Sequence, residues 1–173
     1  MQPVRAEQTV RPDGSSVRPM IEGVKVRPSV TQQDHRGSLC EIYMPSWGFD
    51  DVPLVSAYVV TTRPGQVKGW ALHERHVDRY FFFAGVLKLV LYDGRLDSPT
   101  HGMINELVFS EVNRSLVSVD PGIYHAVQNI GRVDGLMFNL PSEPYDYEHP
   151  DKLTLPLDTD QIPYVFTTGA RGY

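Results

Sequence analysis

Short apolar runs, separated by turn signals at intervals of about ten residues, occupy the chain from Leu54 to Leu140. The runs are LVSAYVV, RYFFFAG, VLKLVLYD, ELVF, LVSV and LMFNL. Runs of this kind, with Gly, Pro and Asp between them, are typical of strands in a sandwich or barrel. No stretch of a dozen residues has the i, i+3, i+4, i+7 apolar spacing of an amphipathic helix. The sequence therefore predicts an all-β fold with few short helices.

Both ends of the chain differ from this pattern. Residues 1–30 carry prolines at positions 3, 12, 19 and 28, and these disfavour a helix because proline fixes φ and lacks an N–H. We expect an extended N-terminal arm over residues 1–30, in which VKV at 24–26 can pair as an edge strand, and one domain over residues 31–173. The acidic, proline-containing segment 142–160 is predicted to be irregular coil.

Composition excludes several classes of protein. The formal net charge is −5, and no cluster of Lys and Arg suits a nucleic-acid backbone. Cys40 is the single cysteine, so an intrachain disulfide framework and a thiolate zinc cluster are both excluded. No apolar stretch approaches the roughly 18 residues of a membrane helix, and the N-terminus has no apolar signal region. We expect a cytoplasmic protein that binds a small molecule.

The segment 65–85 has the most informative spacing in the chain, with Gly65, Ala71, His73, Asp78 and Gly85 as its fixed points. It resembles the first motif of the cupin superfamily, in which a histidine stands at the position of Ala71 and a glutamate at that of Asp78. The segment 121–129, which contains His125, resembles the second cupin motif. The resemblance implies a cupin jelly-roll barrel or sandwich.

Strand geometry brings these motif residues together, because residues two apart on a strand point to the same face. Ala71 and His73 therefore share a face, and His125 reaches the same cavity from another strand. His76 is three residues beyond His73, so we expect it to point away from the pocket unless a bulge intervenes.

Several segments within residues 34–164 narrow the resemblance to the dTDP-4-dehydrorhamnose 3,5-epimerases of deoxysugar biosynthesis. They are DHRGSLCE at 34–41, VKG at 67–69, LYDGRLDSPTHG at 91–102 and PGIYHAVQN at 121–129. The segment at 91–102 is the most specific of them. The resemblance implies a homodimer that acts on a nucleotide-linked 4-keto sugar without a metal or other cofactor.

Epimerisation beside a ketone requires a base for the C–H proton, donors for the developing enolate oxygen, and an acid on the opposite face. By the resemblance, the family's base position falls on Ala71 and its acid position on Phe138, and neither side chain carries an exchangeable proton. The position of a family lysine that helps to hold the enolate falls near Asp78, which reverses the local charge. The catalytic set is therefore rearranged in this chain.

Replacement residues can be proposed from their positions. His73 lies one pleat from Ala71, about 6.5 to 7 Å along the strand, and is the preferred base. His125 is placed to polarise the sugar carbonyl, and Asp158 to orient a histidine as a late aspartate does in the family. Tyr145, together with Tyr147, is a substitute acid, although aromatic residues near the end of a barrel also serve to cap its core.

Substrate-binding positions follow from the same resemblance. Arg36 and Glu41 match residues that reach the nucleotide from the neighbouring subunit, and Lys68 matches an arginine near the pyrophosphate. Trp70 is assigned to the substrate site as pocket wall, with a place in the core as the alternative. Arg36 also has a purely structural interpretation as a turn residue paired with Asp34.

Two other interpretations stay open. His73, Asp78 and His125 form a two-histidine, one-carboxylate set suited to Fe, Mn or Zn, which predicts a metal-dependent oxygenase or isomerase. The competing structural interpretation pairs Asp78 with Arg75 or Arg79. Loss of the usual base and acid also suits a small-molecule-binding cupin without catalytic activity.

Overall fold

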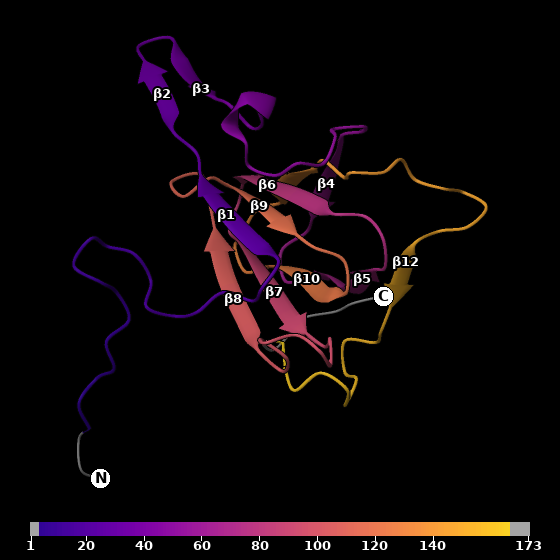
Figure 1. The fold of residues 1–173 in the computed structure, drawn as a ribbon. Helices are drawn as coiled ribbons and strands as arrows, with labels where there is room; N and C mark the ends of the chain where they lie inside the picture. The colour runs from indigo at the N-terminus through magenta and orange to yellow at the C-terminus, as the bar shows by residue number, and fades with distance from the viewer. Residues whose placement is uncertain (1–3, 167–173) are drawn as a thin grey trace.

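Two five-stranded antiparallel sheets face each other in the computed structural model, which describes residues 4–166 (Figure 1). The first sheet has the order β1 (Val24–Pro28), β9 (Ser115–Val119), β6 (Asp78–Ala84), β11 (Gly135–Asn139) and β4 (Tyr58–Thr62). The second has the order β12 (Lys152–Thr154), β5 (Val67–His73), β10 (Ile123–Asn129), β7 (Leu87–Asp93) and β8 (Ile104–Phe109). The 3₁₀-helix η1 (Pro45–Trp47) is the one helical element among the described residues. The predicted all-β jelly roll is therefore confirmed.

Each apolar run identified in the sequence contributes to a strand, because alternate side chains of the run can be buried between the sheets. VKV at 24–26 lies in β1, which pairs with β9 at the edge of the first sheet. The prediction of irregular coil for residues 142–160 is wrong at one place. Residues 152–154 form β12, which pairs with β5 and extends the second sheet.

The main core fills the space between the two sheets. Its fully buried members include Phe82, Leu89, Leu91, Val117 and Ile123. Burial of one such side chain contributes roughly 1.5–3 kcal/mol to folding, so this layer holds the sandwich closed.

Both outer faces of the sandwich are partly covered as well. Trp70 on β5 packs beneath Tyr164 and Phe166 of the C-terminal segment. Phe81 on β6 packs on the opposite outer face, beneath the segment that carries η1. Burial on both faces explains why Tyr80, Phe81 and Phe82 form a continuous apolar run instead of alternating.

A buried arginine ties the first sheet to the loop that follows η1. The Arg79 side chain is fully buried, and its guanidinium forms two hydrogen bonds with the Asp50 carboxylate, at 2.6 and 2.9 Å. It also donates to the backbone carbonyls of Val52, Pro53 and Leu140. The cation is thus paired and hydrogen-bonded, as a buried charge must be.

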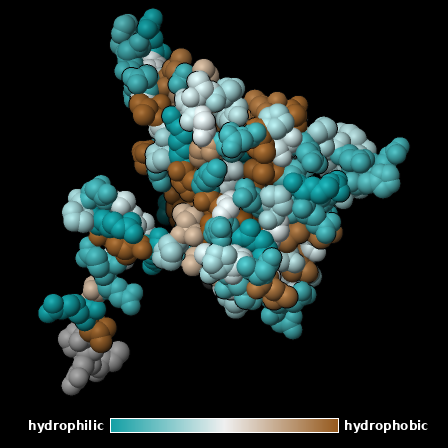
Figure 2. All heavy atoms as spheres, viewed as in Figure 1, coloured by the Kyte–Doolittle hydropathy of each residue, from teal (hydrophilic) through white to brown (hydrophobic). Residues whose placement is uncertain are grey.

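The β2–β3 hairpin (Thr31–Asp34 and Gly37–Cys40) projects from one end of the sandwich, and the N-terminal segment extends away from another side (Figure 1). The tip of this hairpin and the loop before β12 carry mainly hydrophilic residues (Figure 2). Within residues 4–166, no helix has the length and apolar character needed to cross a membrane.

Candidate active site

A cavity of about 950 Å³ opens between the two sheets. Its walls come from β4, β5, β6, β10 and β11, and its rim comes from residues 141, 143–147, 151 and 152. Ala71 and His73 of β5 both line it, and His125 of β10 lines it from the neighbouring strand. The shared face expected for Ala71 and His73 is present because both lie within one continuous strand.

Three imidazoles converge on Asp78, the first residue of β6. His73 Nε2 lies 3.3 Å and His125 Nε2 3.6 Å from Asp78 Oδ2. His76 Nε2 lies 3.5 Å from Asp78 Oδ1. Asp78 therefore pairs with histidines of the cavity, and the alternative pairing with Arg75 or Arg79 is wrong. Because neighbouring residues of a strand face opposite sides, Arg79 points away from Asp78 and meets Asp50 instead.

Neutral donors complete the surroundings of the Asp78 carboxylate. The Tyr80 hydroxyl donates to Oδ2 at 2.6 Å and the Asn139 side chain donates to Oδ1 at 2.8 Å. Asn139 also donates to the Tyr58 hydroxyl at 2.8 Å. Burial raises the pKa of Asp78, but the histidines and Tyr80 outweigh it and hold that pKa well below the ordinary value. A buried negative charge thus lies beside the three imidazoles that line the cavity.

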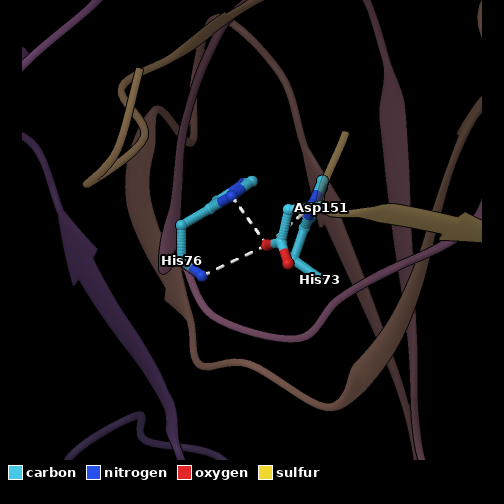
Figure 3. Close-up of side chains that lie close together, drawn as sticks. All are labelled: His73, His76 and Asp151. Atoms are coloured by element: carbon cyan, nitrogen blue, oxygen red, sulfur yellow. Dashed lines mark hydrogen bonds and ion pairs between the residues drawn. The ribbon is translucent and has the colours of Figure 1, made fainter. Parts of the chain in front are cut away.

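His76 faces the cavity, so the expectation that it points away is wrong. Strand alternation applies only up to His73, where β5 ends, and the chain turns before β6 begins at Asp78. In this turn the His76 ring lies against the His73 ring, with the ring centroids 3.8 Å apart and the ring planes tilted by 36°. His76 Nδ1 lies 3.0 Å from Asp151 Oδ2 (Figure 3).

Asp151 is a further residue of the site that the sequence analysis did not identify. Its carboxylate accepts hydrogen bonds from the backbone N–H groups of Glu74, Arg75 and His76, at 3.2 to 3.3 Å. Asp151 directly precedes β12, in which Lys152 pairs with His73. The short alternating run KLTL was the available signal, because a strand there places the preceding aspartate beside the end of β5.

The three histidines differ in their protonation. Burial lowers the pKa of His73 to about 4, despite the neighbouring Asp78, and burial also lowers the pKa of His125. Burial lowers the pKa of His76 too, but the carboxylates of Asp78, Asp151 and Glu143 outweigh it and leave that pKa above its ordinary value. Two neutral imidazoles and one imidazole that favours its cationic form therefore share the cavity.

Two of the other predicted site residues also line the cavity. Lys68 lies on β5, and Tyr145 lies on the rim with its side chain more than half exposed. Tyr145 forms an edge-to-face pair with Tyr147, which is also at the rim. Phe138 does not line the cavity and packs against Phe81 and Phe83 on the outer face of the first sheet.

The structure places Trp70 in the core and not at the cavity wall. The side chain has no exposed surface, and its ring contacts Tyr164 and Phe166. Trp70 is adjacent to Ala71 on β5, so strand alternation directs it to the outer face of the sheet. The alternative of a core residue is the correct one, and the substrate-binding assignment is not supported.

The remaining predicted residues lie outside this cavity. Asp158 is exposed and does not line it, and the carboxylates beside the histidines are those of Asp78 and Asp151. Arg36 lies at the turn of the projecting β2–β3 hairpin, where its side chain is 79% exposed and pairs with Asp34. Glu41 directly follows the same hairpin and is also exposed.

Two overlapping sets of side chains have donor atoms close enough to surround a divalent ion. One set is His73, Asp78 and His125, and the other is His73, His76 and Asp151, with the donor atoms of each set within 4.8 Å of one another. Imidazole and carboxylate donors suit zinc, manganese or iron. The Asp78 carboxylate already accepts two hydrogen bonds from protein groups, which leaves it less available to an ion.

The two facing sheets and the imidazole-lined cavity between them define a cupin-type protein with a small-molecule site. No family model matches the chain. The chain is 33% identical over 141 residues to a probable low-salt glycan biosynthesis epimerase of Haloferax volcanii, covering 81% of this chain and 90% of that protein. The chain therefore belongs to the dTDP-4-dehydrorhamnose 3,5-epimerase-like family of the cupin superfamily.

Two further comparisons agree with this family. The spore coat polysaccharide biosynthesis protein SpsL of Bacillus subtilis is 29% identical over 156 residues, which cover 88% of this chain and all of that protein. A solved dTDP-6-deoxy-D-glucose-3,5-epimerase of Legionella pneumophila, in complex with dTDP-4-keto-L-rhamnose, superposes with a TM-score of 0.77. The superposition covers 91% of this chain and 86% of the Legionella pneumophila chain, and at 16% sequence identity it shows that the two proteins share a fold.

Proposed function

We propose that this protein is a sugar-nucleotide epimerase that moves a proton at a carbon next to the ketone of a nucleotide-linked 4-keto sugar. One observation carries the proposal: the cavity holds three imidazoles around a buried carboxylate, although the family's base position is occupied by Ala71. A binding module that had lost catalysis would have no need of buried ionisable groups, because each of them costs free energy to desolvate.

The proposed reaction proceeds through an enolate. Neutral His73 accepts the proton when the C–H bond breaks, and the electron pair moves onto the ketone oxygen as the enolate forms. His125 lies 5.6 Å from His73 between ring centroids, and it is proposed to help orient the carbonyl. Tyr145 at the rim is proposed to return a proton to the opposite face of the same carbon, and exchange with water then restores both side chains.

We propose that the substrate is a dTDP-linked sugar, in keeping with the ligand of the Legionella pneumophila enzyme. Lys68, which lines the cavity, is proposed to contact the diphosphate. In the same proposal the protein is a cytoplasmic homodimer. The exposed hairpin of each subunit then carries Arg36 and Glu41 to the cavity of its partner, which explains why they lie outside their own.

Solvent deuterium provides the direct test of this function. In D₂O, the protein is expected to introduce deuterium at C3 or C5 of dTDP-4-keto-6-deoxyglucose, because the proton returned to the enolate comes from exchangeable groups. Mass spectrometry and proton NMR of the sugar report the number and position of the deuterons. The function is rejected if dTDP binds but no 4-keto sugar tested acquires deuterium.

Activity is expected to survive removal of divalent ions. Proton transfer by imidazoles needs no metal, and the Asp78 carboxylate is already hydrogen-bonded. Protein dialysed against a chelator should therefore exchange deuterium within about twofold of the untreated rate, with added Zn²⁺, Mn²⁺ or Fe²⁺ giving no increase. A loss of exchange that one of these ions restores would favour a metal-dependent cupin.

A further inference from the structure

Both ring nitrogens of His76 face carboxylates. Nδ1 lies 3.0 Å from Asp151 Oδ2, whereas Nε2 lies 3.5 Å from Asp78 Oδ1. Both contacts are ion pairs, and the one with Asp151 is the shorter. An imidazole placed between two carboxylates is stabilised as a cation, because each carboxylate favours the charged form of the ring.

The turn that carries His76 is held firmly in place. Three consecutive backbone N–H groups, those of residues 74–76, donate to the Asp151 carboxylate. Asp151 is only 8% exposed. It directly precedes β12, which is hydrogen-bonded to β5. One aspartate therefore fixes the backbone of the turn and the direction of the imidazole together.

We propose that His76 is a third catalytic imidazole, oriented by Asp151, whose Nε2–H donates to the enolate oxygen of the substrate. This inference rests on the proposed function, because an enolate forms only if the protein removes a proton beside a ketone. The long contact with Asp78 is the one that the substrate oxygen replaces, and the Asp151 contact is kept. In this proposed step His76 keeps its proton, so no covalent bond to it forms or breaks.

The charge around the site supports this assignment. Neutral His73 becomes cationic when it accepts the substrate proton, and the ketone oxygen becomes negative at the same time. A cation already fixed in a sheltered cavity stabilises that oxygen without reorganisation of solvent. The His76 side chain is 14% exposed, and its ring centroid lies 3.8 Å from that of His73, so the proposed donor lies beside the proposed base.

The charged and titratable groups that face His76 come from several elements. They are Asp151 before β12, Asp78 of β6, Glu143 of the rim, His73 of β5 and His125 of β10. Asp151 makes the shortest contact of this set, so it acts as the positioning residue. Replacing its carboxylate by a neutral amide is expected to weaken the cationic form of His76.

Three variants test the inference. His76→Gln removes the cation and is expected to lower kcat for deuterium exchange roughly 10²-fold, the usual effect of losing one donor to an oxyanion. His76→Lys restores a cation and is expected to exchange at least tenfold faster than His76→Gln. Asp151→Asn is expected to give a smaller loss and to move the alkaline limb of the pH–rate profile to lower pH.

Binding and folding are measured alongside exchange. All three variants are expected to bind dTDP with wild-type affinity by calorimetry, because the enolate contact involves the sugar and not the nucleotide. His149→Gln is the matched control, since His149 is 82% exposed and lies outside the cavity, and it should exchange at the wild-type rate. Circular dichroism checks that each variant is folded.

The outcomes separate this inference from the function on which it rests. If the wild-type protein exchanges deuterium and His76→Gln does so equally well, His76 has no catalytic role. If His76→Lys is as slow as His76→Gln while both remain folded, the role assigned to the cation is wrong. If the wild-type protein shows no exchange, the proposed function fails first.

Discussion

Replacement of His73 by asparagine is expected to lower the rate of deuterium exchange by roughly 10²–10⁴-fold, the range for loss of a general base. Asparagine keeps the polarity of the side chain but cannot accept the proton. Burial lowers the pKa of His73 to about 4, so the side chain is neutral near pH 7. Asparagine is neutral too, so the variant should remain folded. Single-turnover exchange, measured by mass spectrometry with the protein in saturating excess over the sugar nucleotide, gives the rate directly.

The pH dependence of exchange provides an independent check on His73. A base must be neutral, and the pKa of His73 is lowered from 6.5 to about 4 by burial. As pH falls, the wild-type rate should therefore hold through pH 6 and decline only as pH approaches 4, as long as the protein stays folded. His101→Asn, at an exposed position in the β7–β8 connection, is the control and should match the wild type. An acid limb centred near pH 6.5 would show that another histidine is the base.

Replacement of Asp50 by alanine is expected to lower the free energy of unfolding by about 3–5 kcal/mol. The substitution leaves the Arg79 guanidinium in a fully buried position without its counter-ion. The carbonyl acceptors of residues 52, 53 and 140 would remain, but they do not neutralise the charge. Urea denaturation followed by tryptophan fluorescence measures the change.

A second ion pair of similar geometry serves as the control for Asp50. Arg36 and Asp34 form a close pair at 2.6 Å, but their side chains are 79% and 47% exposed. Asp34→Ala should therefore change the urea midpoint little, because water solvates the arginine that remains. If Asp50→Ala and Asp34→Ala lowered the free energy of unfolding equally, burial of Arg79 would not be the reason for the stabilising effect of the Arg79–Asp50 ion pair.

The architecture was predictable because it depends on local periodicity. Strands that bury one or both faces show apolar alternation or continuous apolar runs, and both patterns can be recognised without knowledge of their partners. Strand alternation also predicted that Ala71 and His73 share one face of β5. Trp70 obeys it too, since its place next to Ala71 already assigns it to the opposite face of β5.

The candidate site was only partly predictable. Motif spacing brought His73, Asp78 and His125 together, as the distances confirm. His76 was misassigned because alternation was extended past the end of β5 into a turn. Asp151 was not identified because it lies 75 residues from His76 along the chain, and no spacing rule connects them.

The amino-acid order by itself determined the β-sandwich and the two cavity histidines, since these depend on residue type and short-range periodicity. Only the tertiary structure decided which charges meet. The addition of β12 to β5 brings Asp151 to the turn at residues 74–76, and the packing of β6 against the loop at residues 50–53 buries Arg79 beside Asp50. Such contacts depend on strand order and register, which form through long-range packing rather than local sequence preference.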